Sequence, residues 1–118
     1  MDKLMVYGIP NCDTVKKTLD WFKKKSIGFQ FHDYKKLGIG KVKLEDWCAK
    51  VGWEILLNRK SATWRELSGA EQERATNQTS AIKIMMKNNS IIKRPVIEFG
   101  DKLIVGFNEE EYKILLNK

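Results

Sequence analysis

The stretch L-M-V-Y-G-I-P-N-C-D-T-V-K-K, residues 4–17, decides the fold. It begins with a short apolar run over residues 4–8 that turn-forming residues end, which is typical of a buried strand. Over residues 13–25 the apolar side chains recur every three or four positions, which predicts an amphipathic helix. Residues 29–32 then alternate apolar and polar side chains, which predicts a second strand. A helical crossover of this length favours parallel pairing of the two strands.

The C-terminal part of the chain predicts an antiparallel hairpin and a closing helix. Two short apolar runs, residues 96–99 and 102–105, flank Gly100-Asp101, which is typical of a hairpin turn. Residues 109–116 have helical periodicity, and Asn108 is placed to cap that helix. A parallel strand–helix–strand unit joined to an antiparallel hairpin gives a mixed four-stranded sheet of the α/β class, with helices expected on both faces.

The middle of the chain predicts helices only. Helical periodicity recurs from about residue 43 to residue 89, and Ser68 with Glu71 three positions later forms a capping-box pattern. We therefore predict one domain over residues 1–118, in which residues 43–89 form a helical insertion.

Composition narrows the functional classes. The chain has 118 residues, of which 42% are hydrophobic, and this excludes a disordered tail. No apolar run approaches the roughly 20 residues that span a bilayer, so no membrane association is expected. The 22 Lys and Arg against 15 Asp and Glu give a net charge of +7, which favours an anionic ligand: nucleic acid, a phosphate-like oxyanion or the carboxylates of glutathione. The alternative is that the scattered lysines are simply solvated on helix faces.

The two cysteines and the single histidine are too few for a structural zinc site, which needs four such ligands, so no metal is expected. The start of the chain lacks the pattern of a signal peptide, and the low cysteine content suits a reducing compartment. We therefore expect a cytoplasmic protein. The sole histidine, His32, is expected to be a packed or surface residue rather than a general base.

Cys12 lies where a strand and a tight loop lead into the first helix. Free N–H groups and the positive end of the helix dipole stabilise a thiolate there, and the same groups can hold an oxyanion. A lowered thiol pKa makes Cys12 a candidate nucleophile. The alternative is a cysteine that merely caps the helix. We place its neighbours Asn11, Asp13 and Thr14 in the candidate binding site.

The second thiol, Cys48, lies on an apolar helical face, so we expect a core residue whose pKa burial raises. A C-x-x-C redox pair is absent, because Val15 stands three positions after Cys12.

Two arginines are candidate anion ligands. Arg94 precedes a predicted strand and is expected near the strand ends that carry Cys12, where its guanidinium fork can bind an oxyanion or carboxylate. The alternative is an ordinary surface arginine. Pro95 is a candidate cis-proline at the first residue of that strand. Arg59 lies in a segment that interrupts the helical pattern.

Four segments together resemble the arsenate reductase/Spx family, most closely its YffB-like branch. They are Y-G-I-P-N-C-D-T-V-K-K at 7–17, L-L-N-R-K-S-A-T-W-R-E-L at 56–67, I-K-R-P at 92–95 and G-F at 106–107, and they run in order over nearly the whole chain. The resemblance implies a thioredoxin-like fold with a helical insertion. It also implies that Cys12 is the catalytic cysteine, that Arg59 and Arg94 bind anions, and that Pro95 is the cis-proline.

The chain departs from the family pattern at three places. Gly8 stands where the arsenate reductases have a histidine, and their third arginine falls at about Gly106, which Phe107 follows. The C-x-x-C switch found in many Spx proteins is missing. In the arsenate reductases the cysteine attacks arsenate, glutathione then attacks arsenic, and glutaredoxin reduces the mixed disulfide. The missing arginine predicts inefficient reduction of arsenate.

Two functions are therefore expected as alternatives. The first is a glutathione-dependent thiol reductase without a tightly bound cofactor, with glutathione as co-substrate and glutaredoxin as a candidate partner. The second is an Spx-like regulator that binds RNA polymerase without catalysis. Direct binding to nucleic acid is not expected, because no helix-turn-helix pair with a basic recognition helix and no RNA-binding strand motif is present.

Overall fold

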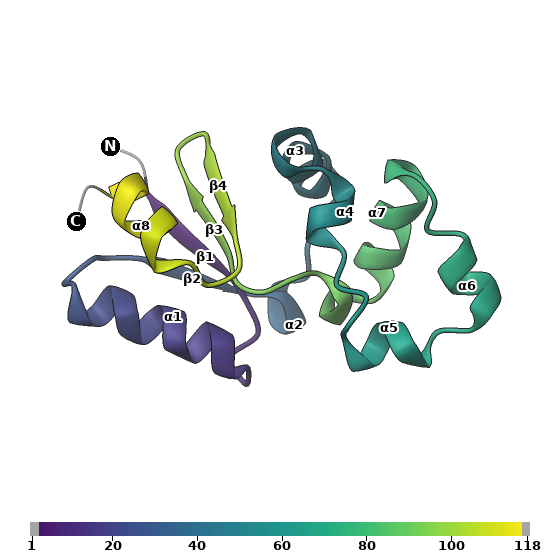
Figure 1. The fold of residues 1–118 in the computed structure, drawn as a ribbon, viewed down its shortest axis with the longest axis horizontal. Helices are drawn as coiled ribbons and strands as arrows, with labels where there is room; N and C mark the ends of the chain where they lie inside the picture. The colour runs from purple at the N-terminus through teal and green to yellow at the C-terminus, as the bar shows by residue number, and fades with distance from the viewer. Residues whose placement is uncertain (1–2, 117–118) are drawn as a thin grey trace. The chain divides into compact units, whose positions relative to one another are not determined.

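The computed structural model describes residues 3–116. These divide into two compact units (Figure 1). The sheet unit comprises the chain up to Asp33 and from Arg94 onward, and the helical unit comprises Tyr34–Lys93. The predicted insertion at about residues 43–89 falls inside the helical unit. The assignment of the whole chain to a single domain stays a prediction.

The sheet unit contains the predicted mixed four-stranded sheet. Its strands are β1 (Leu4–Gly8), β2 (Gln30–Asp33), β3 (Val96–Phe99) and β4 (Lys102–Val105), in the order β2-β1-β3-β4. Strand β1 pairs parallel with β2 and antiparallel with β3, and β3 pairs antiparallel with β4. The predicted thioredoxin-like α/β fold is confirmed.

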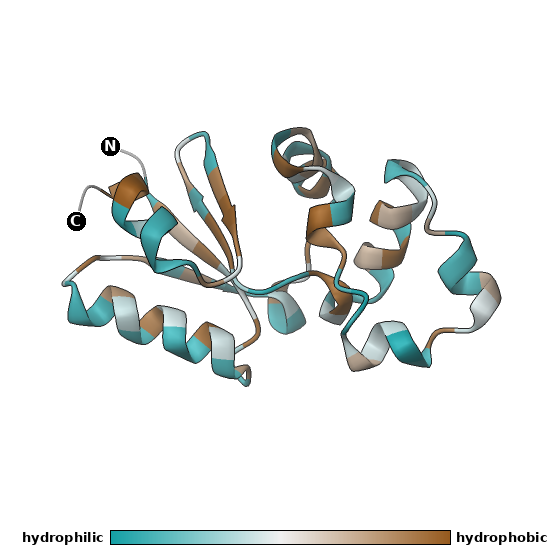
Figure 2. Cartoon of the chain, in the orientation of Figure 1, coloured by the Kyte–Doolittle hydropathy of each residue, from teal (hydrophilic) through white to brown (hydrophobic). Residues whose placement is uncertain are grey.

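Helices α1 (Asp13–Lys24) and α8 (Glu109–Leu116) pack on the same face of this sheet. Val6 pairs with Ile97, and Ile97 pairs with Ile104, so these three side chains share one face. Trp21 and Phe22 of α1 and Tyr112 of α8 belong to the same buried cluster. We predicted helices on both faces, but the two helices of the sheet unit cover one. Figure 2 shows hydrophobic and hydrophilic residues alternating along α1.

Tyr112 joins the end of the hairpin to the closing helix. Its hydroxyl donates to the Gly106 carbonyl at 2.6 Å, and the Gly106 N–H donates to the Pro95 carbonyl at 2.7 Å. Burial raises the pKa of Tyr112 to about 12, so the phenol stays a neutral donor at physiological pH. The predicted Asn108 cap is confirmed, because its side-chain oxygen accepts from the Glu111 N–H at 3.0 Å. The start of β3 is thus tied to the segment that leads into α8.

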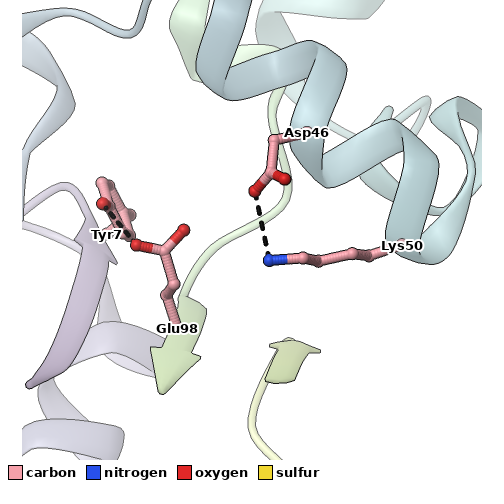
Figure 3. Close-up of polar contacts among 4 residues, drawn as sticks. All are labelled: Tyr7, Asp46, Lys50 and Glu98. Carbon is pink, nitrogen blue, oxygen red and sulfur yellow. Dashed lines mark hydrogen bonds and ion pairs between the residues drawn. The ribbon is translucent and has the colours of Figure 1, made fainter. Parts of the chain in front are cut away.

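The helical unit contains six α-helices and one 3-10 helix among its residues. They are α2 (Tyr34–Leu37), α3 (Lys41–Val51), α4 (Trp53–Leu56), α5 (Ala62–Glu66), α6 (Gly69–Glu73), α7 (Gln78–Lys87) and η1 (Asn89–Ile91). The predicted capping box between Ser68 and Glu71 is present at the start of α6. On α3, Lys50 and Asp46 form an ion pair at 3.2 Å (Figure 3). The two residues are four positions apart, which places them side by side on the solvent-exposed face of the helix.

The core of the helical unit comes from α3, α4, α7 and η1. Its fully buried side chains include Leu44, Trp47, Leu56, Met85 and Ile91. Of the helices in residues 3–116, none is both long enough and apolar enough to cross a membrane.

Candidate active site at the start of helix α1

Cys12 is the N-cap residue of α1, immediately after the loop that follows β1. Its backbone is extended, with φ −145° and ψ 123°, and its carbonyl accepts the first helical hydrogen bond from the Lys16 N–H at 2.9 Å. The side chain is partly exposed and is a free thiol. This placement directs the amide groups of the first helical turn toward the sulfur, as the sequence predicts.

The electrostatic surroundings of Cys12 favour its thiolate. Partial burial by itself raises the pKa of the thiol, but the Val15 N–H, the Arg94 guanidinium and the Thr14 N–H together outweigh burial and lower the pKa below the ordinary value. The two amides belong to the first turn of α1, and they stabilise the thiolate by pointing their N–H groups at the sulfur. The direction of this pKa shift is the one that the sequence predicts.

Arg94 reaches Cys12 because of the antiparallel register of the sheet. Tyr7 near the end of β1 pairs with Val96 at the start of β3, so a residue just before β3 lies beside the residues that follow β1. The guanidinium acts on the Cys12 sulfur both as a hydrogen-bond donor and as a positive charge. The Arg94–Pro95 peptide bond is cis, as predicted.

The remaining predicted site residues beside Cys12 face solvent. Asn11, Asp13 and Thr14 are exposed. The Thr14 carbonyl accepts from the Thr18 hydroxyl at 2.9 Å, which holds the first turn of α1 in place. Thr14 contributes its backbone N–H to the Cys12 sulfur, as Arg94 contributes its guanidinium, and Asn11 and Asp13 flank Cys12 in the chain. Their roles in substrate binding stay predictions.

Arg59 lies in the helical unit, between α4 and α5, where two tryptophans hold its side chain. The guanidinium carbon lies 5.8 Å from the ring centroid of Trp53 and 5.8 Å from that of Trp64. Contacts of this kind stabilise a guanidinium and restrict its motion. Sequence reasoning selected Arg59 but missed both tryptophans; their nearness in sequence was the available signal. That Arg59 helps to bind the anion attacked by Cys12 stays a prediction.

Gly106 could not carry the third arginine without strain. Its φ is +90°, a conformation that residues with a side chain rarely adopt. The next residue, Phe107, packs edge-on against Tyr112 with ring centroids 5.6 Å apart. The Lys17 ammonium lies 4.6 Å above the Phe107 ring. The residue after Gly106 is therefore an aromatic ring that packs on Tyr112 and under Lys17, and it offers no guanidinium.

The other two residues considered for chemistry are packing residues. Cys48 is buried, and burial together with the negative charge of Glu45 raises the pKa of its thiol, as predicted. His32 lies against the ring of Tyr7, with centroids 4.8 Å apart. The Tyr7 hydroxyl in turn donates to a carboxylate oxygen of Glu98 at 3.0 Å (Figure 3). Neither contact places His32 in a catalytic role.

A hollow of about 520 Å³ lies elsewhere in the sheet unit, between β4 and α8. Leu103, Ile104 and Leu115 are among the residues that line it, and none of the predicted site residues does. The candidate active site is therefore the open helix terminus, where a small oxyanion or an extended thiol peptide can approach the sulfur.

The contact between Arg94 and Cys12 leads to a testable prediction. A hydrogen bond to a charged group is worth roughly 1.5–3 kcal/mol, and part of this is offset because a thiolate of higher pKa is more nucleophilic. Arg94→Gln should therefore slow alkylation of Cys12 at pH 6 by about three- to tenfold. The control is Arg65→Gln, which removes an exposed arginine of the helical unit. Equal rates for Arg94→Gln and the wild type would exclude this role of Arg94.

Comparisons with known proteins agree with this geometry. The model of the ArsC family matches residues 7–115. A solved YffB protein is 39% identical, covers 95% of this chain and 97% of its own, and superposes with a TM-score of 0.91. An arsenate reductase (ArsC) related protein from Brucella melitensis is 38% identical, with coverage of 98% and 96% and a TM-score of 0.75.

More distant relatives and structures of this fold have other names and functions. The global transcriptional regulator Spx from Streptococcus agalactiae is 25% identical over 91% of this chain and 78% of its own length. A glutaredoxin from Archaeoglobus fulgidus, at 22% identity and a TM-score of 0.50, shares the fold alone; the match covers 100% of this chain and 89% of that one. With a helix-capping cysteine, an adjacent arginine and a cis-proline in place, and with a family match over most of its length, the chain belongs to the ArsC family.

Proposed function

We propose that this protein is a glutathione-dependent thiol reductase of the arsenate reductase type, with Cys12 as its single nucleophile. The observation that carries the proposal is the Arg94 guanidinium beside a partly exposed, helix-capping thiol of lowered pKa. Burial and a raised pKa leave Cys48 unreactive by comparison. With one reactive thiol, the second sulfur must come from outside the chain, and glutathione supplies it.

The proposed reaction on an oxyanion such as arsenate balances at every step. The Cys12 thiolate attacks arsenic, a sulfur–arsenic bond forms, and an oxygen leaves as water after protonation. The glutathione thiol then attacks arsenic, a second sulfur–arsenic bond forms, and another oxygen leaves as water. The two sulfurs next join in a mixed disulfide as both sulfur–arsenic bonds break. Two of the bonding electrons stay on arsenic, which is reduced from arsenic(V) to arsenic(III) and leaves as a trivalent oxyanion after it takes up water. A second glutathione, acting through glutaredoxin, reduces this disulfide by thiol exchange and restores Cys12.

The protein contributes charge stabilisation at each step. The amides of the first turn of α1 and the Arg94 fork would hold the oxyanion, whose negative charge grows as the thiolate attacks. The same groups make Cys12 a good leaving group when the mixed disulfide is reduced, because a thiol of low pKa leaves faster. Arg59, restrained by its two tryptophans, is proposed as a further anion ligand.

The physiological substrate is proposed to differ from arsenate. Gly106 and Phe107 remove one cation from the pattern that the resemblance implies, and a charged contact of about 1.5–3 kcal/mol corresponds to roughly tenfold to hundredfold in binding. We expect slow turnover in an assay that combines arsenate, glutathione and glutaredoxin. An arsenate reductase with all three arginines, assayed in parallel, is the control. Comparable turnover by the two proteins would contradict the proposed discrimination against arsenate.

The charge distribution favours one alternative function, that of an Spx-like regulator. The helical unit holds 12 of the 22 Lys and Arg but only 6 of the 15 Asp and Glu, so it carries most of the net positive charge. Such a surface suits an acidic protein partner, and RNA polymerase is the candidate. Capture of polymerase subunits by both the wild type and Cys12→Ser, without thiol turnover, would favour this alternative.

A further inference from the structure

Gly8, the last residue of β1, lies where three segments of the site meet. It is buried, and a Cβ atom placed on it would lie 2.8 Å from Cγ2 of Val15. The same Cβ would lie 3.8 Å from Cβ of Arg94. The first distance is shorter than carbon atoms tolerate, so any side chain at this position has to displace Val15.

Val15 has little freedom to move aside. Its side chain is fully buried at 0% exposure, and a valine in a helix has one strongly preferred rotamer. Close-packed interiors transmit such a displacement to the backbone rather than absorbing it. The backbone N–H of Val15 makes the largest single contribution that lowers the pKa of Cys12, and Arg94 contributes both a hydrogen bond and its charge. The two residues nearest to the missing side chain are therefore the two main partners of the sulfur.

We propose that Gly8 is a positioning residue: the absence of a side chain there lets Val15 pack against the end of β1, where its backbone N–H points at the Cys12 sulfur beside Arg94. This inference rests on the proposed role of Cys12 as a reactive thiolate. Gly8 has no contact with the substrate in this account, and it acts only through the two groups that hold the sulfur.

Substitution of Gly8 by alanine tests the inference directly. In Gly8→Ala the Cys12 alkylation profile should shift to higher pH, and the rate at pH 6 should fall by about three- to tenfold as the Val15 amide loses its alignment. The matched control is Gly28→Ala, because a Cβ there meets nothing within 4 Å. Gly28→Ala should retain the wild-type profile.

A second substitution distinguishes the contact with Val15 from a general loss of stability. Val15→Ala removes the methyl groups that the new Cβ would strike but keeps the backbone N–H. The double variant Gly8→Ala/Val15→Ala should therefore have the same pH profile as Val15→Ala alone. If Gly8→Ala alone fails to fold, as judged by circular dichroism, the comparison of the double variant with Val15→Ala still tests the contact with Val15.

The outcomes separate this inference from the proposed function. If the wild-type thiol titrates below the ordinary range and Gly8→Ala has the same profile, the positioning role is wrong and the reactive thiolate stands. A double variant that reacts several-fold more slowly than Val15→Ala at pH 6 would likewise overturn the positioning role. If the wild-type thiol titrates like a free cysteine, the proposed function fails, and the inference about Gly8 fails with it.

Discussion

Cys12→Ser is expected to abolish the formation of a mixed disulfide between this protein and glutathione. The hydroxyl of serine stays protonated at neutral pH and forms no disulfide, while Cys48 is buried and has a raised pKa. Intact-protein mass spectrometry after incubation with oxidised glutathione measures the adduct directly. The wild type should carry one glutathione, and Cys12→Ser should carry none.

Cys48→Ser is the matched control for this experiment, because it removes the other thiol and leaves the site unchanged. It should form the glutathione adduct at the wild-type rate. An adduct on Cys12→Ser at the wild-type rate would assign the reactive thiol to Cys48 and would contradict the proposed reaction.

The largest expected effect on stability comes from Phe22, which anchors α1 to the sheet. Its side chain is fully buried, and its ring lies 5.3 Å from that of Tyr112 and 5.9 Å from that of Phe29, measured between centroids. Removing a buried phenylalanine side chain costs about 3–5 kcal/mol, through lost burial and the cavity left behind. Phe22→Ala should lower the free energy of unfolding by that amount in a urea titration followed by circular dichroism.

Ile114→Ala is the control for this prediction. Ile114 is a large apolar residue of the same unit but is 81% exposed, so its truncation should change the free energy of unfolding by less than about 0.5 kcal/mol. Equal losses for the two variants would show that α1 does not pack on the sheet as described.

Local sequence patterns predicted most of the sheet unit. Strand lengths, the turn at Gly100-Asp101 and the Asn108 cap are set by neighbouring residues, so the sequence carries their signals. The four-residue helix α2 was not predicted, because Tyr34–Leu37 is too short to show a period. The shared face of α1 and α8 was not predicted either, because periodicity identifies the buried side of a helix but not the sheet face it covers.

In the candidate site, too, some residues have a local sequence signal and others depend on tertiary contacts. Cys12 is recognisable because a strand, a tight loop and a helix follow one another in sequence, and Arg94 because it precedes the partner strand. The indole rings around Arg59 and the close approach at Gly8 depend on contacts made only after folding. A glycine at the end of a strand gives no sequence signal that distinguishes a packing requirement from an ordinary turn.

The most direct test of the central claim is the alkylation rate of Cys12 as a function of pH, measured with iodoacetamide in the Cys48→Ser variant. Alkylation follows the thiolate, so a lowered pKa keeps the rate high as the pH falls and moves the inflection to lower pH. We predict an inflection clearly below the value of about 8.5 that an unperturbed cysteine shows. An inflection at or above that value would contradict the claim that the start of α1 and Arg94 hold this sulfur as a thiolate.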